Sequence, residues 1–417
     1  MAKRDAKATA PKVRFPEFVD AQNWSVAPMR KLYAFMRNNL LSRDKLNYER
    51  GVAKNIHYGD IHTKFQALFD VTRESVPFIN ESESVPGADS EDYCVEGDLI
   101  FADASEDMRD VGKCIEVVRL AGERLLAGQH TILARPKDDA LVVGFGGHLF
   151  RSGLMRSRIE KEAQGTKVYQ ISSSRLGGIV ITYPSDKGEQ QKIADCLTSL
   201  DEVIAAQGRK VEALKAHKRG LMQQLFPREG ETRPRLRFPE FRDAPEWELT
   251  PLSRVFLRIT NGKANAQDHE EGGAYPLFDR SEVIKVSASF AFAAEAVIIP
   301  GEGASFRPKY FNGKFNLHQR AYALMECQGS AKYFFYALDY AKDALALKAV
   351  KSTVLSLRLP IIQKFVVPLP ERQEQQRIAD CLSSLDTRIT AETRQLAALK
   401  THKQGLMQQL FPAPEAA

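Results

Sequence analysis

One basic and aromatic stretch in the second half of the chain has the composition of a nucleic-acid contact. The segment PGEGASFRPKYFNGKFNLHQRAYALM (300–325) interleaves cationic side chains with aromatic ones. Cations contact phosphates, glycines let a backbone approach a ligand, and Arg or Gln bonds base edges bidentately. An ordinary basic loop between strands has the same composition, so both interpretations stay open. In this half we predict DNA contacts at Lys263, Ser305, Arg307, Lys309, Tyr310, His318 and Arg320, with Lys351 and Ser352 as outer phosphate contacts.

The first half offers a second set of basic side chains. We predict DNA contacts there at Lys64, Arg109, Lys113, His130, Arg151, Arg156 and Arg158. The last three lie in LFRSGLMRSRIEKE (149–162), which reads as a helix start, where charged side chains often simply face water. Losing a base-reading arginine should relax one position of a DNA site, whereas losing a phosphate contact should weaken binding to all sequences alike.

Two clusters of potential metal ligands or acid catalysts are better explained without catalysis. IHYGDIH contains His57, Asp60 and His62, but no third ligand cluster accompanies them, so we predict no metal site. The carboxylates of ADASEDMRD (102–110) could form a nuclease cluster. A turn is the favoured interpretation, with Ser105 or Glu106 reading a base edge, because a carboxylate can accept from cytosine N4.

Catalytic and cofactor motifs are missing from the sequence. It contains no G-x-x-x-x-G-K-[ST] phosphate loop and no N/D-P-P-Y/F tetrapeptide, the signature that resembles an amino-methyltransferase active site. GFGGH (144–148) and GEGAS (301–305) are too short for dinucleotide loops, so we interpret them as turns. We therefore predict no catalytic residue and no cofactor bound by this chain.

A repeat in the sequence predicts the elements that position these residues. Residues 189–227 and 374–412 match at 27 of 39 aligned positions, and RFPEF with a following Trp occurs at 14–24 and again at 237–247. The segments between these repeats show no comparable likeness. We therefore divide the chain into a first variable domain with its N-terminal RFPEF segment (13–188), a long helix (189–227), a linker and second variable domain (228–373), and a second long helix (374–412).

The repeated stretch has a heptad pattern over about five heptads, which predicts a coiled coil. Only about ten residues separate Pro227 from the second RFPEF, so the second variable segment begins near the C-terminal end of the first helix. The second helix leaves that same segment, so its N-terminus also lies there. The two helices should then run antiparallel, each RFPEF meeting the LFP end of a helix. Gln207 and Glu392 should fall near the midpoints, where two arrangements are open: they face each other as a register-fixing pair, or both remain solvated. The fold class we predict is two mixed α/β domains joined by two long antiparallel coiled-coil helices with pseudo-two-fold symmetry.

Composition is typical of an intracellular multidomain protein. The 417 residues suffice for two or three domains, and neither a run of 18 apolar residues nor a signal peptide is present. The five cysteines show no CxxC spacing, and Cys196 and Cys381, at equivalent repeat positions, read as small buried hydrophobes. The net charge of +6 is compatible with DNA but does not predict it. We expect a cytoplasmic protein with no membrane partner.

The EQQ(K/R)IADCL helices that end in GLMQQLFP, each preceded by RFPEF and a variable segment, resemble the specificity (S) subunit of type I restriction-modification systems. NIHYGDIHTKF (55–65), EGDLIFADASEDMRDVGKCIEV (96–117), AGQHTILARP (127–136) and residues 297–324 are similar to the target-recognition domains of that family. The resemblance covers the chain after about residue 12. It implies two target-recognition domains that each read one half of a bipartite double-stranded DNA site.

The resemblance also implies partners and cofactors. Two methyltransferase (M) subunits, and through them restriction (R) subunits, would dock on this non-catalytic chain, with S-adenosylmethionine, ATP and Mg on those partners. Because the two variable segments differ, the DNA site should be asymmetric, with half-sites read on opposite strands and the rod length setting the spacer. Recurrent outward residues of the helices suggest the partner surface, although a recent duplication would also preserve them. We predict partner binding at Lys215, His217, Met222, Gln223, Lys400, His402, Met407 and Gln408.

Two other interpretations remain open. A coiled-coil scaffold whose terminal domains bind proteins would have the same repeats, and it would lack DNA binding that falls steeply with salt. A single-chain restriction and methylation enzyme is disfavoured by the missing motifs and by the length of the chain.

Overall fold

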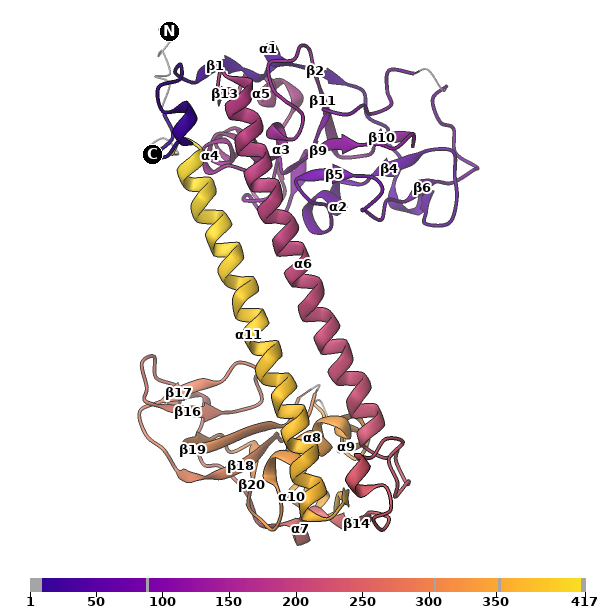
Figure 1. The fold of residues 1–417 in the computed structure, drawn as a ribbon, viewed down its shortest axis with the longest axis vertical. Coiled ribbons are helices and arrows are strands. Elements are labelled where there is room, and N and C mark those ends of the chain that lie inside the picture. Colours follow the sequence, from indigo (N-terminus) through magenta and orange to yellow (C-terminus); the bar gives the residue numbers. More distant parts are fainter. Residues whose placement is uncertain (1–9, 88–89, 304, 352–353, 414–417) are drawn as a thin grey trace. The chain divides into compact units, whose positions relative to one another are not determined.

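The computed structural model describes residues 10–87, 90–303, 305–351 and 354–413. The chain divides into two compact units, which we call unit 1 (residues up to 206 together with those from 396) and unit 2 (207–395). Two 39-residue helices, α6 (Lys187–Leu225) and α11 (Arg372–Leu410), each contribute one half to each unit. Figure 1 shows both helices among the smaller elements.

Unit 1 contains a mixed five-stranded sheet in the order β2-β11-β7-β9-β5 and a four-stranded sheet in the order β10-β4-β6-β3. The pairs β5–β9 and β10–β4 are parallel and the others antiparallel. Two-stranded pairs β1–β13 and β12–β8 complete the unit. Its strands are β1 (Ser25–Pro28), β2 (Tyr33–Met36), β3 (Leu46–Asn47), β4 (Lys54–Ile56), β5 (Leu68–Asp70), β6 (Phe78–Ile79), β7 (Leu99–Ala102), β8 (Ala104–Ser105), β9 (Cys114–Arg119), β10 (Leu125–Ala127), β11 (Thr131–Pro136), β12 (Tyr169–Gln170) and β13 (Val180–Tyr183).

Short helices cover the sheets of unit 1. They are η1 (Pro16–Phe18), α1 (Met29–Leu32), η2 (Arg43–Lys45), α2 (Tyr58–Thr63), α3 (Phe145–Leu149), α4 (Gly153–Glu162) and α5 (Ser173–Gly178). The predicted turn GFGGH is instead the start of α3, with Gly144 in the left-handed region at φ 95°, where glycine has no steric penalty. The β7 strand is buried on both faces, as expected for the apolar run LIFA at the centre of a covered sheet.

Unit 2 is built on one six-stranded sheet, in the order β15-β20-β18-β19-β16-β17, plus the pair β14–β21. Only β16–β19 is a parallel pair among these. Its strands are β14 (Glu248–Pro251), β15 (Phe256–Asn261), β16 (Tyr275–Phe278), β17 (Lys285–Ser287), β18 (Phe292–Pro300), β19 (Lys309–Leu317), β20 (Ala321–Cys327) and β21 (Val366–Leu369). Its short helices are η3 (Pro239–Phe241), α7 (Leu252–Val255), η4 (Ala266–Asp268), α8 (Ala331–Tyr340), α9 (Lys342–Leu347) and α10 (Leu359–Lys364).

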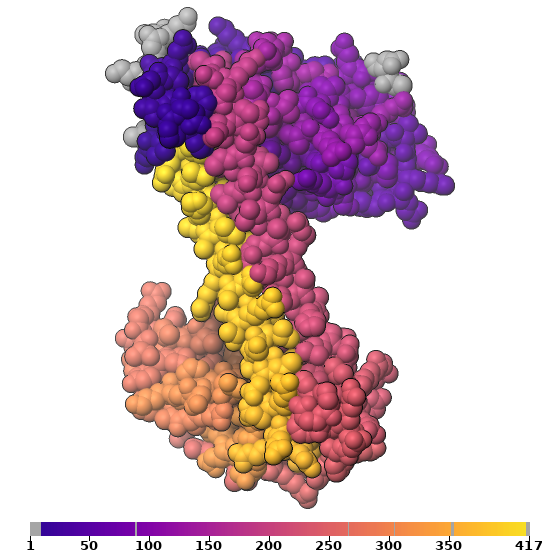
Figure 2. Space-filling view, in the orientation of Figure 1, coloured from indigo at the N-terminus to yellow at the C-terminus, as the bar shows by residue number. Residues whose placement is uncertain are grey.

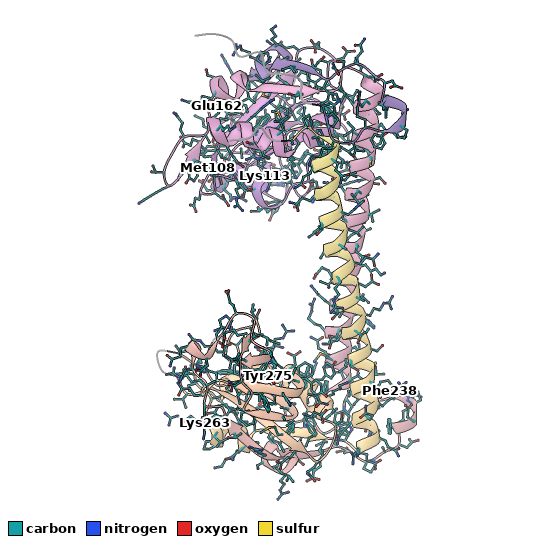
Figure 3. The ribbon with its side chains drawn as sticks, turned by 90° about the vertical axis from the view of Figure 1, so that its left-hand side faces the viewer. Met108, Lys113, Glu162, Phe238, Lys263 and Tyr275 are labelled. Carbon is teal, nitrogen blue, oxygen red and sulfur yellow. The ribbon has the colours of Figure 1, made fainter. Side chains whose placement is uncertain are left out.

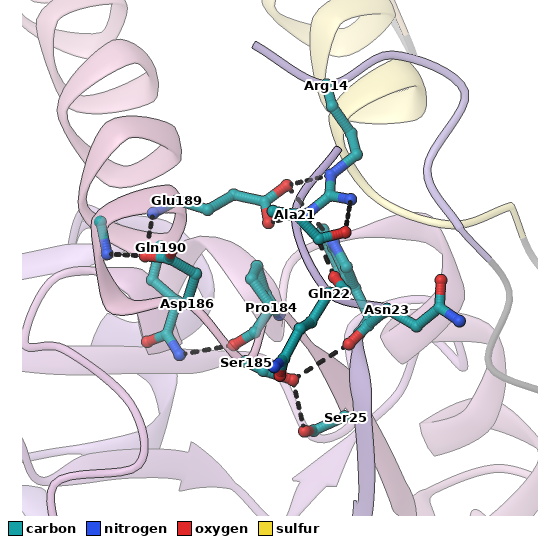
Figure 4. Close-up of polar contacts among 12 residues, drawn as sticks. Arg14, Ala21, Gln22, Asn23, Ser25, Pro184, Ser185, Asp186, Glu189 and Gln190 are labelled. Carbon is teal, nitrogen blue, oxygen red and sulfur yellow. Dashed lines mark hydrogen bonds and ion pairs between the residues drawn. The ribbon is translucent and has the colours of Figure 1, made fainter. Parts of the chain in front are cut away.

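The first turn of each long helix is fixed by a buried carboxylate. In unit 1, Arg14 Nε donates to Glu189 Oε1 at 2.8 Å (Figure 4). Trp24 Nε1 donates to the same oxygen at 3.4 Å. In unit 2, Arg237 Nε donates to Glu374 Oε1 at 2.8 Å and Trp247 Nε1 donates to Oε2 at 3.0 Å. We call these two groups the clamps. They explain why RFPEF, Trp and the first Glu of EQQ are repeated together.

The second residue of each EQQ motif bonds the backbone of other segments in the same unit. Gln190 Oε1 accepts from Val142 N at 2.9 Å, and its Nε2 donates to Pro184 O at 2.8 Å and to Ala140 O at 2.9 Å. Gln375 Oε1 accepts from Ser330 N at 3.0 Å, and its Nε2 donates to Pro370 O at 2.8 Å. The N-terminal part of each long helix is thereby joined to the segments around it in the same unit.

Each RFPEF segment also meets the end of a long helix, as predicted. In unit 1, Val13 N donates to Gln409 O at 3.1 Å, and the Trp24 ring lies edge-on to Phe411 at 6.3 Å. Figure 2 shows this N-terminal segment, in indigo, against the yellow end of α11. In unit 2, the equivalent bond joins Leu236 N to Gln224 O at 2.9 Å.

Within each unit the two long helices run antiparallel. In unit 1, Lys403 Nζ donates to Asp201 Oδ1 at 2.5 Å, and in unit 2, Lys218 Nζ donates to Asp386 Oδ1 at 2.6 Å. Gln207 Nε2 donates to Glu392 Oε2 at 2.7 Å, so the predicted facing of these two residues is confirmed. One expectation needs correction, because Cys196 and Cys381 are half-buried rather than buried.

Candidate nucleic-acid interface

Unit 1 gathers three histidines around one tyrosine. The Tyr58 ring stacks on His57 at 4.7 Å and meets His62 and His130 edge-on at 6.2 and 5.3 Å. His57 Nδ1 accepts from Gly59 N and so caps α2. His130 adopts φ 58° in the turn between β10 and β11. We call these four side chains the histidine cluster; flat rings of this kind can stack on bases or donate to base edges.

A buried carboxylate organises the cations beside the histidine cluster. Asp60 is 1% exposed and accepts from Arg43 Nη2 at 2.9 Å, and Lys64 Nζ lies 3.0 Å from the same oxygen. Lys64 also donates to Tyr48 Oη at 3.1 Å. The hydrogen bond to Asp60 raises the pKa of Lys64, so this exposed lysine is fully charged at neutral pH.

The segment 103–113, which includes β8, contacts the histidine cluster. His130 Nδ1 lies 3.3 Å from Asp103 Oδ1, whose pKa is raised by burial. His62 Nε2 lies 3.0 Å from Ala104 O, and Lys113 Nζ donates to His62 O at 2.8 Å. Lys113 is labelled in Figure 3. The predicted residues Lys64, Lys113 and His130 therefore lie around one site, and Arg109 is an exposed residue of the same segment.

Three predicted arginines instead hold the backbone of unit 1. Arg151 Nε donates to Cys114 O at 3.1 Å. Arg156 Nη2 donates to Val111 O at 2.6 Å, and Arg158 Nη1 donates to Val180 O at 2.6 Å. Burial lowers the pKa of Arg151 and of Arg156. Because these guanidinium groups are committed to backbone carbonyls, we leave all three out of the proposed DNA contacts.

Unit 2 carries a polar hollow of about 570 Å³. Its lining comes from the segment after β15, the β16–β17 connection and the β19–β20 turn. Two predicted residues, His318 and Arg320, lie here. Sequence reasoning missed the other members of this hollow: Asn265, Gln267, Asp279, Arg280, Lys285 and Gln319.

Four other predicted residues of unit 2, namely Ser305, Arg307, Lys309 and Tyr310, line a second, larger groove of about 1130 Å³. Tyr310 Oη donates to Glu295 Oε1 at 2.6 Å, and Lys309 donates to Ser281 O. Burial lowers the pKa of Lys309. Ser305 and Arg307 are exposed at its edge, and Arg307 lies 3.6 Å from Asp339. The basic stretch that motivated the prediction is therefore divided between two hollows rather than forming one patch.

Three predicted residues of unit 2 lie outside both hollows or outside the described part of the chain. Lys263, labelled in Figure 3, and Lys351 are exposed, and Ser352 lies outside the described residues. Asn265, Gln267, Asp279 and Arg280 gave a weak signal in sequence, since NAQD (265–268) and DR (279–280) are short polar runs outside the basic stretch. Gln319 lies inside the basic stretch, where its glutamine side chain was a signal that the prediction did not use.

The residues that resembled metal ligands have other partners. His57 caps α2 and Asp60 binds cations. Across residues 10–87, 90–303, 305–351 and 354–413, no group of three or more His, Cys, Asp or Glu side chains is arranged to hold a metal ion.

The predicted partner residues differ in accessibility. Met222 is 7% exposed and belongs to the core of unit 2, so packing explains its repetition and we remove it from the partner surface. Met407 is half-buried against the core of unit 1, and Lys215 is half-buried beside Glu212. The exposed predicted residues are His217, Gln223, Lys400, His402 and Gln408.

Comparison with known proteins decides the family. A sequence-family model described as "Type I restriction modification DNA specificity domain" matches residues 74–216 and 245–401. The chain belongs to this family. It is a specificity chain, which agrees with the prediction of a non-catalytic role.

Individual relatives are distant. The chain is 21% identical to a putative type I restriction enzyme MjaX specificity subunit of Methanocaldococcus jannaschii, over 94% of this chain and 93% of that one. It is 29% identical to the EcoDI specificity subunit of Escherichia coli over 34% of this specificity chain, a match that spans only 31% of the relative.

The fold agrees with solved structures. The S subunit of a type I restriction-modification system from M. genitalium matches with a TM-score of 0.62 at 17% identity, over 98% of this chain and 100% of that one. A second structure, from work on assembly of the type I system, matches with a TM-score of 0.53 at 16% identity over 93% and 97%. No helix in the described part of the specificity chain is long and apolar enough to cross a membrane.

Proposed function

We propose that this specificity chain reads an asymmetric, bipartite double-stranded DNA site, one half with each unit. The observation that carries the proposal is the contrast between the clamps, which are alike in both units, and the candidate surfaces, which are not. Unit 1 offers the histidine cluster and Lys64, whereas unit 2 offers an amide- and arginine-lined hollow. Different donors and acceptors recognise different base pairs, so the half-sites should differ.

We further propose that α6 and α11 form one antiparallel coiled coil with pseudo-two-fold symmetry. The equivalent pairs Lys403–Asp201 and Lys218–Asp386 support this arrangement. Such symmetry would present the half-sites on opposite strands, with the helix length setting the spacer between them. The boundaries 13–188, 189–227, 228–373 and 374–412 remain our proposed division into recognition domains and helices.

Two methyltransferase subunits, and restriction subunits through them, are the partners we propose. S-adenosylmethionine, ATP and Mg would bind those partners in the cytoplasm and not this chain. The repeated exposed residues His217, Gln223, His402 and Gln408 support a docking surface present in both halves. Gln191 and Gln376 repeat as well, each bonding an aspartate one turn later at 2.8 Å.

Sequencing of methylated bases in DNA tests the proposal. The chain would be expressed in a methylation-deficient host with and without its methyltransferase partner. Adenine methylation at one asymmetric bipartite motif is expected only when both are present. Methylation by this chain alone would overturn the non-catalytic role. Binding of the complex to DNA without sequence preference would overturn the specificity role and favour the protein-binding scaffold.

A further inference from the structure

The polar hollow of unit 2 contains a glutamine whose position is fixed on two sides. Gln319 Nε2 donates to Asn265 Oδ1 at 2.7 Å. Its backbone is also held, since Gln319 N donates to Ala264 O at 2.9 Å and Asn261 Nδ2 donates to Gln319 O at 3.1 Å. Gln319 is nevertheless exposed. An exposed side chain of this length normally samples many rotamers and loses that freedom when a ligand binds. Because Gln319 is already anchored, binding would cost less side-chain entropy.

The anchored amide retains the groups that recognise a purine. Within the described residues, Gln319 Oε1 and its second Nε2 hydrogen have no protein partner. An amide that presents one acceptor and one donor side by side matches adenine in the major groove, which offers the N6 donor beside the N7 acceptor. Guanine offers two acceptors at that edge, so the same amide would leave its oxygen facing another acceptor.

The neighbours of Gln319 suit the approach of DNA. His318 Nδ1 accepts from Arg320 N at 3.1 Å, which places the proton of the neutral ring on Nε2 as a further donor. Arg280 is exposed and has no ion-pair partner among the residues described, whereas Arg320 is paired with Glu302 at 2.6 Å and Lys285 with Asp279 at 2.7 Å. One unpaired arginine beside an anchored amide combines a phosphate contact with a base contact.

We propose that Gln319, positioned by Asn265, reads an adenine in the half-site of unit 2, and that Arg280 contacts a phosphate beside it. This inference rests on the proposed function, because it names the base type that one of the two recognition surfaces selects. Asn265 acts here as a positioning residue, since it holds Gln319 and need not touch the DNA.

The test measures binding of the intact complex to duplexes that carry each single base-pair change in the half-site of unit 2. Gln319→Ala should lower affinity for the preferred duplex by roughly 10- to 100-fold and abolish discrimination at one A·T position only. Asn265→Ala should relax the same position with a smaller loss. Arg280→Ala should weaken all duplexes alike and reduce the salt slope by about one.

A single-atom change in the DNA sharpens the test. Replacing that adenine by 7-deazaadenine removes the N7 acceptor, so the wild-type complex should bind the modified duplex more weakly than the unmodified one. The Gln319→Ala complex should bind the two duplexes with equal affinity. Gln328→Ala is the matched control, because Gln328 is an exposed glutamine whose side chain, among the described residues, bonds only the Glu326 carbonyl. Native circular dichroism of each variant would verify folding.

Two outcomes would overturn the inference for different reasons. If the wild-type complex discriminates but Gln319→Ala keeps every preference, or weakens all duplexes equally, Gln319 is not a base reader. If the wild-type complex shows no preference among the duplexes, the proposed function itself fails and this inference with it.

Discussion

In unit 1 the buried carboxylate of Glu189 binds Arg14 and Trp24, and in unit 2 Glu374 binds Arg237 and Trp247 with similar distances. The sheets that these clamps hold differ, with five and four strands in unit 1 and six in unit 2. The candidate surfaces differ as well, aromatic and histidine-rich in one and amide-lined in the other. The contrast separates the residues that hold the molecule together from those that select a ligand.

The largest effect should come from breaking the clamps. Arg237→Ala should reduce the free energy of unfolding of unit 2 by about 3–5 kcal/mol, because it leaves a buried carboxylate unpaired. Arg14→Ala should cost less, since the Arg14 side chain is 13% exposed and that of Arg237 is 4%. Urea unfolding can be followed by fluorescence, because the chain has two tryptophans and each belongs to one clamp.

Substituting the other tryptophan by phenylalanine isolates each signal, and Arg254→Ala, at an exposed position, is the control. Equal losses for the two clamp arginines would contradict the dependence on burial.

The next effect concerns pH and unit 1. Burial lowers the pKa of His148, whose Nε2 lies 3.1 Å from Thr198 Oγ1, to about 3, and raises that of Glu116 to about 7. From pH 6.5 down to 3 the unfolded state binds the histidine proton more readily, so the His148 contribution destabilises unit 1 as pH falls. From pH 4.5 up to 7 the unfolded state loses the Glu116 proton first, so that contribution destabilises unit 1 as pH rises.

His148→Gln should therefore gain stability relative to wild type as pH falls below 6.5, by a few kcal/mol near pH 4. Urea titrations at several pH values would measure the difference between the two proteins. A difference that does not change with pH would show that His148 titrates normally in the folded state.

A smaller effect should distinguish the two lysine–aspartate pairs of the long helices. Lys218→Met should cost about 1–2 kcal/mol and Lys403→Met somewhat less. The reason is that Asp386 also accepts from Tyr336 Oη at 2.7 Å and Lys218 lies 4.9 Å from the Tyr336 ring, so the network in unit 2 is larger. Thermal unfolding would rank the variants, and Tyr336→Phe should reduce the difference between them.

The smallest effect belongs to exposed ion pairs that repeat outside the clamps. Lys192 lies 3.1 Å from Glu17, and Arg377 lies 3.2 Å from Glu240, so a lysine and an arginine make the same contact in the two copies. All four side chains are about half exposed, so solvent screens both pairs and a double-mutant cycle should give little or no coupling for either one. A coupling as large as that of the Lys218–Asp386 pair would show that these pairs stabilise the clamps.

The parts of the structure that could be predicted are those that a local pattern or a repeat encodes. The heptad pattern located the long helices and the facing of Gln207 and Glu392. The cations of LFRSGLMRSRIEKE were misleading, because burial of Arg151 and Arg156 depends on carbonyls of a distant strand and loop. The hollow of unit 2 could not be found, since Asn265 and Gln319 meet only when β15 and β20 pair.

The glutamines of the EQQ motifs have an evolutionary consequence. Within the described residues, the side chains of Gln190 and Gln375 bond the rest of their units through backbone N–H and carbonyl groups, including those of Val142 and Ser330. Hydrogen bonds to backbone groups do not depend on most of the side chains of the segment that they hold. Recombination between genes could therefore insert an unrelated reading domain behind an unchanged helix, and the recipient would acquire a new DNA target without rebuilding the attachment.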